Sequence, residues 1–466
     1  MNRVATRETD SGAVVCFADP KRPVQDTPPI AFLYPAFPVL HQTFVMWEAL
    51  ALRKLGLRMQ LFSLQRPPVG KQQPEAAALL DEVVYLPSLF SPRVLWANVS
   101  FFSRNPHRYV SVLAKLLQGW WRDRAKLLAQ RRQAPRLQVA MSWKVRLERL
   151  WNTSPLVFLV KTLGLVPRAV LLGELLQRNG VRRVHAHWAT HATTVALLVR
   201  WLFGLRFSFT AHAYDIYLMP LFLPVKLQEA DLVVTCAKVN AEYLRSLCSG
   251  QQHKIVVNYH GVDVQRFSPR PRERSGPIPQ IVTCGALRVY KGHHVLIEAC
   301  SLLRRPVRCV IIGEGPQRRV LEKQARELGV ADRIEFTGAL VQEEVARRYA
   351  EADLFVLASI VVEESGRQDV IPNVLVEAMS MGMAVVASAL PGIKELIEDG
   401  VHGRLVPPGD AKALATAIEQ LLDDPVARSE FGRRGRQRVL ESFDREKNVR
   451  DLAFVLQRGV WGHGER

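Results

Sequence analysis

Hydrophobic runs alternate with amphipathic stretches along most of the chain, starting near residue 30. The run Ile30–Tyr34 predicts a buried strand, residues 44–54 predict a helix that ends at Gly56, and residues 58–63 predict a second strand. A strand, a helix and a strand in this order indicate a β-α-β unit and therefore a parallel sheet. Three more strand-like runs extend the pattern, at residues 183–187, 207–210 and 232–235, and a helix is predicted at residues 191–203.

A second alternating series occupies the C-terminal half of the chain. Its predicted strands, with helical stretches between them, lie at residues 280–284, 307–312, 334–336, 354–357 and 384–387. Residues 267–279 separate the two series and are rich in proline and charge, which is typical of an interdomain linker. We therefore predict an α/β protein with two Rossmann-like, doubly wound domains that face a central cleft.

These patterns divide the chain into consecutive parts. The predicted parts are a loose tail at 1–28, an N-terminal domain at 29–266, the linker at 267–279, a C-terminal domain at 280–440 and a C-terminal helix at 441–466. The last helix is expected to pack back on the N-terminal domain. Because the tail is polar and lacks the apolar core of a secretory signal, we do not expect it to direct export.

The overall composition is that of a globular protein with an unusual charge. Hydrophobic residues make up 48% of the 466 residues and charged residues 23%, which argues against a disordered chain. The formal net charge of +19 predicts attraction to an acidic partner such as a membrane surface or a phosphate-bearing substrate. The six cysteines form no C-x-x-C pair, so free thiols in a reducing cytoplasm are expected.

Most of the excess charge lies in one insert within the N-terminal domain, at about residues 91–183. Between Arg93 and Arg183 there are 18 Lys and Arg residues against three acidic ones, together with five of the nine tryptophans. Arginine and tryptophan on one helical segment favour peripheral contact with an anionic membrane. An insert packed on its own domain is the alternative, and nucleic-acid binding is less favoured because no recognised motif accompanies the charge.

No segment of the sequence is predicted to span a membrane. The most apolar stretch, from Ser154 to Leu176, is interrupted by Lys161, Pro167, Arg168 and Glu174, which a lipid-exposed helix tolerates poorly. We therefore expect the protein in the cytoplasm, held peripherally on the inner face of the cytoplasmic membrane.

Candidate chemistry gathers in the second series of strands. Arg288 and Lys291 lie in a loop between a predicted strand and a predicted helix, where cations and backbone amides bind phosphate well. Gly313 and Gly315 follow the next strand in a similar position. This short glycine pattern is weak by itself, because a simple turn needs the same residues.

The run from Asp369 to Glu377 is more informative. Asp369 lies in a loop, and Glu377 lies one to two turns into the following helix. The backbone N–H groups between them offer an anion site, and the residues that carry these groups are Val370, Ile371, Pro372 and Asn373. The alternatives are that Asp369 only caps the helix and that Glu377 is a solvated helical residue.

Several histidines require separate interpretation. His185, His187 and His191 have a spacing that suggests a metal site, but we see no Cys, Asp or Glu nearby to complete it and expect a polar wall of the cleft instead. His293 and His294 are expected at the surface. His212 is either a structural histidine or a functional one.

Taken together, these motifs resemble glycosyltransferase family 4, a family of retaining enzymes with the GT-B fold, and most closely its bacterial exopolysaccharide branch. The resemblance covers about residues 30–455. The matching segments are Tyr34–Phe44, Phe209–Asp215, Ala230–Thr235, Asn258–Asp263, Lys291–His293, Gly313–Pro316 and Val376–Gly382.

The resemblance implies a role for each matching position. Lys291 would meet the donor diphosphate, Glu377 the ribose, Asp369 the sugar, and His212 would lie near the reacting centre. Asp369 replaces the usual Glu, and Val370 and Ala286 replace the usual Gly and Arg, with Arg288 as a possible substitute for that arginine. Because Val370 carries a Cβ, a positive φ at this position would be costly.

The implied activity is that of a metal-independent glycosyltransferase of the hexosyltransferase type. It would move a sugar from a nucleotide-sugar donor to a glycan acceptor, which is expected to be lipid-linked, with retention of configuration and without a cofactor or nucleic-acid partner. The leaving phosphate would help to take the acceptor proton. Two other functions remain open, a nucleotide-sugar epimerase on the same fold and a catalytically silent scaffold of a polysaccharide assembly complex.

Overall fold

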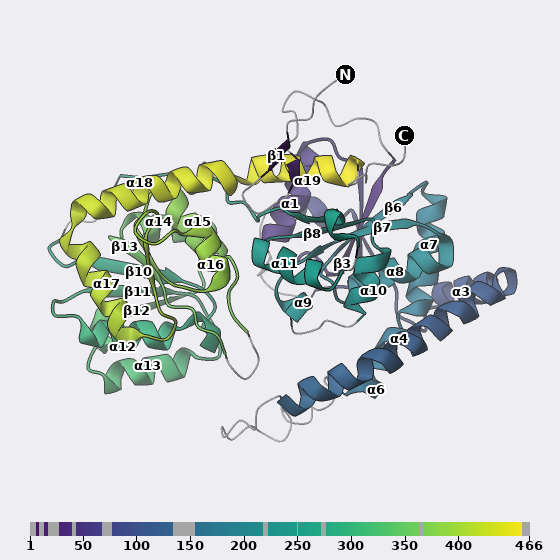
Figure 1. Cartoon of the computed structure of the whole chain (residues 1–466), viewed down its shortest axis with the longest axis horizontal. Coiled ribbons are helices and arrows are strands. Elements are labelled where there is room, and N and C mark those ends of the chain that lie inside the picture. The colour runs from purple at the N-terminus through teal and green to yellow at the C-terminus, as the bar shows by residue number, and fades with distance from the viewer. Residues whose placement is uncertain are drawn as a thin grey trace. The chain divides into compact units, whose positions relative to one another are not determined.

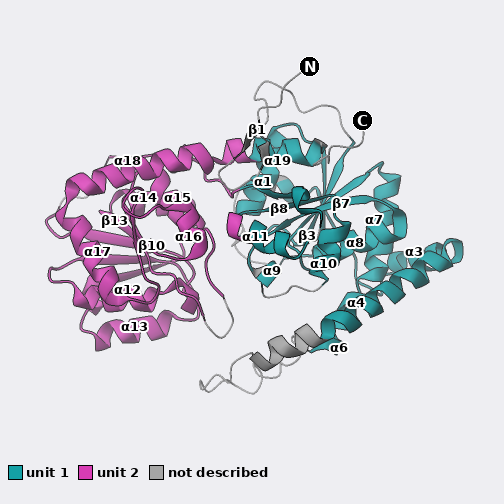
Figure 2. Ribbon diagram, viewed as in Figure 1, with its two compact units in different colours: residues 1–236, 240–258, 449–466 teal, residues 237–239, 259–448 magenta. Residues whose placement is uncertain are grey.

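The computed structural model divides the chain into two compact units (Figures 1 and 2). Unit 1 comprises residues 1–236, 240–258 and 449–466, and unit 2 comprises residues 237–239 and 259–448. The structure describes residues 6–8, 14–16, 28–39, 43–67, 77–133, 154–217, 222–248, 250–271, 276–362 and 367–458.

Unit 1 is built on a parallel sheet of seven strands in the order β5-β4-β3-β6-β7-β8-β9. The strands are β3 (Ile30–Ala36), β4 (Met59–Gln65), β5 (Val83–Tyr85), β6 (Arg183–His187), β7 (Arg206–Ala211), β8 (Leu232–Thr235) and β9 (Ile255–Val257). Because successive side chains of a strand point to opposite faces, β3 contributes to two cores. Ala31 and Leu33 join one apolar cluster, whereas Ile30, Phe32 and Tyr34 join the other.

Helices cover both faces of this sheet. They are α1 (Thr43–Lys54), α2 (Ala77–Leu80), α7 (Val166–Arg178), α8 (His191–Phe203), α9 (Tyr214–Tyr217), α10 (Leu223–Glu229), α11 (Lys238–Ser246) and α19 (Arg445–Arg458). Helices α7 and α8 bury long apolar stretches in the first cluster. The C-terminal residues of α19, including Leu452 and Leu456, lie in the second cluster with Phe32.

The basic insert forms helices α3 (Pro92–Arg104), α4 (Pro106–Gln133) and α6 (Pro155–Leu163), and Figure 1 shows α4 running out beyond the sheet of unit 1. Within the described ranges, residues 155–178 are the one stretch with the length and hydropathy of a membrane span. The structure interrupts this stretch at Gly164, where α6 ends, and packs α7 against α3 and α8.

Unit 2 contains a second parallel sheet, of six strands in the order β12-β11-β10-β13-β14-β15. The strands are β10 (Gln280–Cys284), β11 (Arg308–Ile312), β12 (Ile334–Gly338), β13 (Leu354–Leu357), β14 (Val385–Ser388) and β15 (Arg404–Val406). The helices are α12 (His293–Leu302), α13 (Arg318–Glu327), α14 (Gln342–Ala350), α15 (Asn373–Ser380), α16 (Pro391–Leu396), α17 (Ala411–Asp423) and α18 (Pro425–Ser442). Ile281 and Val282 of β10 face separate cores.

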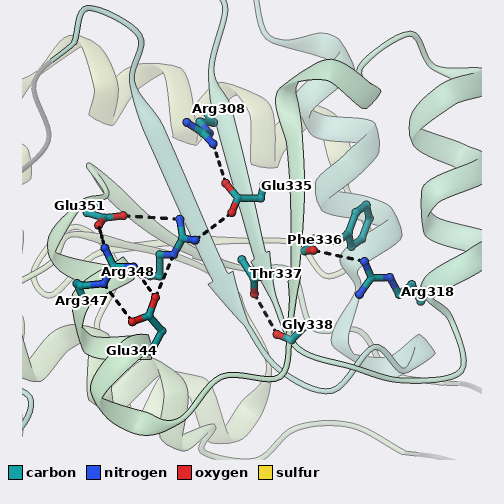
Figure 3. Close-up of polar contacts among 10 residues, drawn as sticks. All are labelled: Arg308, Arg318, Glu335, Phe336, Thr337, Gly338, Glu344, Arg347, Arg348 and Glu351. Atoms are coloured by element: carbon teal, nitrogen blue, oxygen red, sulfur yellow. Dashed lines mark hydrogen bonds and ion pairs between the residues drawn. The ribbon is translucent and has the colours of Figure 1, made fainter.

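Charged side chains line the outer strand β12 of this sheet (Figure 3). Glu335 accepts a hydrogen bond from Arg308 on β11 at 2.8 Å and pairs with Arg348 on α14 at 3.1 Å. Arg348 in turn lies among acidic residues of its own helix, Glu344 and Glu351. Charges on an edge strand oppose its pairing with a second sheet.

The predicted α/β architecture is confirmed, with two parallel sheets and strands at the predicted positions. The predicted linker at 267–279 does not match the observed division, because the chain passes between the units at 258–259 and Val262 and Phe267 belong to a core of unit 2. The first 28 residues, expected to be loose throughout, contain an antiparallel pair, β1 (Thr6–Glu8) and β2 (Val14–Cys16).

Candidate functional site

The sheet of unit 2 has a topological switch point between β10 and β13. Strands that follow β10 along the chain first extend the sheet in one direction, to β11 and β12, and then in the other, from β13 to β15. In doubly wound sheets, ligands bind at such a point, outside the carboxyl ends of the strands. The residues after β10 and β13 are therefore the first place to look for a site.

Glycines bring the loops at this edge into close contact. Gly292 has a φ of +65°, and a Cβ there would lie 1.7 Å from the carbonyl oxygen of Ala358, just after β13. Gly313 has a φ of +145°, and its Cβ would lie 2.0 Å from the carbonyl oxygen of Gly285. Gly315 meets the backbone of Leu287 in the same way. Gly313 and Gly315, the two glycines predicted from the sequence, thus let the backbone of the loop after β10 pass close to them.

Lys291 and Asp369 meet at this point. The Lys291 ammonium Nζ lies 2.8 Å from Asp369 Oδ1, and Ser359 Oγ donates a hydrogen bond of 2.6 Å to Asp369 Oδ2. Each side chain of the ion pair is only 12% exposed. The structure therefore joins three segments, the loop after β10, the end of β13 and the loop before α15, through one carboxylate.

This environment keeps Lys291 positively charged. Burial opposes the charge, but Asp369 and then Tyr290 favour it more strongly, so the pKa of Lys291 is raised above its ordinary value. An ammonium group has three N–H donors, and Asp369 occupies one of them. The others can bind an anion that enters the site.

Arg367 adds a second cation that sequence reasoning did not single out. Its guanidinium carbon lies 4.7 Å from the centre of the Tyr290 ring, and Lys291 Nζ lies 5.4 Å from the same ring. The two cations therefore share one aromatic neighbour, which attracts both electrostatically. The sequence offered one sign of this residue, because Arg367 lies only two positions before Asp369.

Glu377 occupies the second turn of α15 and is only partly exposed. Burial raises the pKa of its carboxyl group to about 7. Cys284, at the end of β10, lies close by, and burial together with the charge of Glu377 raises the pKa of its thiol to about 12. The thiol is therefore protonated at neutral pH, and the acidic group of this pair is Glu377.

The loop between Asp369 and α15 differs from the simplest expectation. Pro372 is the N-cap of α15, so the alternative that Asp369 merely caps this helix is wrong. Among the described residues, positive φ occurs outside glycine only at Trp188 and Phe222. Val370 therefore needs no strained backbone, and Gly392 provides room for the carbonyl group of Val370, which would lie 2.4 Å from a Cβ at that position.

The remaining predicted residues around the site are placed as follows. Ile371 and Asn373 are partly exposed beside Pro372. Arg288 is exposed, and no ion pair holds its guanidinium within the described part of the chain. His293, expected at the surface, is buried with 2% exposure, because the turn at Gly292 directs it toward the backbone of Gly285 and Ala286.

The switch point of unit 1 lies between β3 and β6, where His185 and His187 share one region of the sheet. Both ring nitrogens of His185 bond to hydroxyl groups, of Ser208 and Thr210, each at 2.9 Å, so this ring has no nitrogen left for a metal. The fold brings one acidic residue to these histidines that their sequence neighbourhood did not reveal. His187 Nε2 is 3.0 Å from Glu48 Oε1 on α1.

His212 follows β7 at the same edge and is 7% exposed. Its backbone N–H donates to the carboxylate of Asp215, at 2.9 Å. Its ring lies 5.1 Å from that of Trp188 and 6.2 Å from that of His187, measured between ring centres. His191, the third histidine of the spacing that suggested a metal site, lies at the start of α8 and is half-buried. Burial lowers its pKa to about 4.

Two family models match this chain. The model of the glycosyl transferases group 1 matches residues 265–438, and the model of glycosyltransferase family 4 matches residues 108–266. Together they span the insert from residue 108 onward, the second half of the unit 1 sheet and nearly all of unit 2.

Similar proteins occur in bacterial exopolysaccharide synthesis. WcaL of Escherichia coli, assigned as a colanic acid biosynthesis glycosyltransferase, is 37% identical over 236 residues, which are 49% of this chain and 57% of WcaL. The amylovoran biosynthesis glycosyltransferase AmsK of Erwinia amylovora is 34% identical over 208 residues, 44% of this chain and 51% of AmsK. The chain thus spans about half the length of the curated relatives it matches.

Solved structures with the same fold cover nearly the whole chain. Sucrose-phosphate synthase of Thermosynechococcus elongatus has a TM-score of 0.63 and 19% identity over 93% of this chain and 99% of its own. HepE of Anabaena, in complex with UDP, has a TM-score of 0.62 and 16% identity over 92% of this chain and 99% of its own. This likeness confirms the predicted fold class, in which two parallel α/β domains follow each other along the chain.

Proposed function

Because this chain belongs to glycosyltransferase family 4 and has the GT-B fold, we propose that it transfers a sugar from a nucleotide-sugar donor to a glycan acceptor in exopolysaccharide biosynthesis. The observation that carries this proposal is the largely buried Lys291–Asp369 pair at the switch point of unit 2. A charged lysine held at the carboxyl ends of parallel strands suits the diphosphate of such a donor.

Each residue of the site has a proposed part in holding the donor. Lys291 neutralises the diphosphate, and Asp369 orients the lysine and reaches the sugar. Glu377 accepts hydrogen bonds from the ribose hydroxyl groups. Arg367, beside the same tyrosine as Lys291, supplies further positive charge. HepE, whose structures hold UDP and UDP-glucose, supports a nucleotide-sugar donor for this fold.

The proposed reaction retains the configuration at the anomeric carbon. The acceptor hydroxyl attacks from the face on which the diphosphate leaves, and a phosphate oxygen takes the acceptor proton as the sugar–phosphate bond breaks. Lys291 stabilises the negative charge that develops on the leaving group, which is the task that a divalent metal performs in other enzymes. His212 is the residue of unit 1 proposed to act near the reacting carbon.

A screen of labelled nucleotide sugars against membranes of the source cell tests this function. We expect one donor to transfer its label to a lipid-extractable product in the presence of EDTA, with the anomeric configuration of the donor retained. An epimerase would convert the donor without any acceptor, and a silent scaffold would leave every donor unchanged. Either result would refute the proposal.

We further propose that the acceptor is lipid-linked and that unit 1 contacts an anionic membrane through α4. Four residues of this helix, Val110, Ala114, Leu117 and Trp121, follow one another at the spacing of a single helical face, and all four are exposed. Trp121 is 61% exposed, and the Arg124 guanidinium lies 3.1 Å from its ring centre. This apolar stripe is defined here as the α4 stripe.

The basic residues Lys115, Arg122 and Arg124 lie beside the α4 stripe in the sequence of the helix, and the neighbouring helices also expose apolar side chains. Trp96 on α3 is 74% exposed, and Leu156 on α6 is 63% exposed. Apolar side chains beside arginines suit the boundary between headgroups and acyl chains, where the cations meet anionic lipid. Two tryptophans that contributed to the sequence prediction, Trp143 and Trp151, lie outside the described residues.

Replacing two residues of the α4 stripe should weaken membrane binding. The double variant Leu117→Ser/Trp121→Ser is expected to bind phosphatidylglycerol vesicles at least about tenfold more weakly, because it lacks two apolar side chains that would enter the membrane. Added salt should also weaken the binding of the wild-type protein to these vesicles, because it screens the attraction to anionic lipid. Val426→Ser, on an exposed apolar residue of α18, is the matched control. Equal sedimentation of the double variant and the control with the vesicles would contradict membrane contact through α4.

A further inference from the structure

Trp188 follows directly after β6, at the switch point of the unit 1 sheet. It has a φ of +66°, a left-handed conformation that is costly for a residue with a Cβ. A glycine would adopt this conformation without strain. Strained residues persist when the surrounding structure holds them, and they concentrate at functional sites, so the tryptophan requires an explanation.

Hydrogen bonds on both sides of its peptide hold Trp188 in this conformation. Its own N–H donates to the carbonyl of Thr210 at 2.9 Å, and Thr193 Oγ1 donates to its carbonyl oxygen at 2.6 Å. The next N–H, of Ala189, donates to Asp215 Oδ2 at 2.6 Å. Asp215 is completely buried and also accepts the N–H of His212. One carboxylate thus fixes Ala189, the residue after Trp188, and His212 at the ends of two neighbouring strands.

Aromatic rings surround Trp188 at this edge. The indole ring lies 5.1 Å from His212, 5.9 Å from His187 and 6.3 Å from Phe44 of α1, measured between ring centres. Trp188 and Phe44 are both partly exposed. The cluster therefore combines a hydrogen-bonded backbone with an aromatic surface that a ligand can reach.

Two polar groups next to these rings also indicate a ligand or ordered water. Tyr34 stacks on His187 with ring centres 5.0 Å apart. Both residues are buried, and neither Tyr34 Oη nor His187 Nδ1 has a hydrogen-bond partner within the described ranges. Buried polar groups rarely stay unpaired, so their concentration beside the aromatic surface favours a site that a further molecule completes.

We propose that Trp188, flanked by Phe44 and His212, is the surface on which unit 1 stacks a sugar ring of the acceptor glycan. A pyranose has an apolar face of C–H groups and a polar edge of hydroxyl groups. Such a ring suits an aromatic surface that has a small number of polar groups beside it. The position at the switch point of a doubly wound sheet is where such folds bind ligands. This inference rests on the proposed transfer to a glycan.

The test separates acceptor binding from donor chemistry. The assay uses detergent-solubilised lipid extract of the source cell as the acceptor and the labelled nucleotide sugar selected by the donor screen. Trp188→Ala is expected to raise the acceptor KM about tenfold, with the donor KM and the slow donor hydrolysis without acceptor unchanged. Trp188→Phe should retain most of the acceptor affinity, because it keeps an aromatic face.

Phe90→Ala is the matched control, since Phe90 is an exposed aromatic residue before α3 that has no part in either proposed surface and should not affect the acceptor KM. If Trp188→Ala does not fold, Trp188→Leu serves the same purpose, because it keeps an apolar side chain but lacks an aromatic face. A wild-type acceptor KM in the folded Ala or Leu variant would overturn the stacking role. A wild-type protein that neither hydrolyses nor transfers any donor would instead refute the proposed function.

Discussion

Replacing Lys291 with alanine is expected to reduce the rate of sugar transfer by roughly 10²- to 10³-fold, the usual effect of removing one group that stabilises developing negative charge. The structure gives the reason for so large an effect. Lys291 is 12% exposed, is held by Asp369 at 2.8 Å and has a raised pKa, so its charge is present and fixed before the donor binds. Water cannot replace a preorganised cation at this position.

Steady-state kinetics with the identified donor measure this effect. Lys291→Arg should recover part of the activity, because it keeps the charge with a different geometry. Lys412→Ala is the matched control, since Lys412 is an exposed lysine on α17 of the same unit. A wild-type transfer rate in Lys291→Ala would remove this residue from the donor site.

At a pH above 7, where the carboxyl group is ionised, replacing Glu377 with alanine should lower kcat/KM for the donor by roughly 10- to 100-fold, because a hydrogen bond to a charged carboxylate contributes about 1.5–3 kcal/mol. Glu377→Gln keeps the shape but loses the charge, and it should fall between the wild-type protein and the alanine variant. Kinetics at varied donor concentration distinguish these variants. An unchanged kcat/KM in Glu377→Ala would contradict a contact between this residue and the donor.

The raised pKa of Glu377 also predicts how stability depends on pH. Its pKa is about 7 in the folded protein and 4.5 ordinarily, so between these values the folded state binds a proton that the unfolded state releases. Stability from this group is therefore greatest below pH 4.5 and is lost as pH rises toward 7. Urea unfolding at several pH values should show this loss in the wild-type protein relative to Glu377→Gln, and parallel pH profiles would contradict it.

Long apolar runs made the fold predictable from the sequence. Central strands buried on both faces, such as β8 at Leu232–Thr235 and β13 at Leu354–Leu357, were predicted with their observed ends, because their apolar runs are unambiguous. The short outer strands β5, β9 and β15 were not predicted. Each has only three residues and pairs on one side, so its apolar pattern is too brief to distinguish it from a loop.

The candidate site was predictable as a set of residues but not as a geometry. Lys291 and Asp369 were both selected, yet their ion pair depends on contact between loops 78 positions apart, which no local pattern records. His293 was predicted at the surface but is buried. The left-handed turn at Gly292, which no local pattern records, directs its side chain inward. The importance of Trp188 depends on its φ and its neighbours, and neither is visible in the sequence.

The central claim is that the Lys291–Asp369 site of unit 2 binds a nucleotide-sugar donor, and thermal unfolding of the whole chain with a panel of UDP- and GDP-sugars tests it most directly. A ligand at 100 times its Kd stabilises the folded state by about 2.7 kcal/mol, which is a clear rise in Tm. We predict that at least one donor raises the Tm of the wild-type protein and that the same donor has little effect on Lys291→Ala. No rise with any donor, or equal protection of Lys291→Ala, would contradict this account.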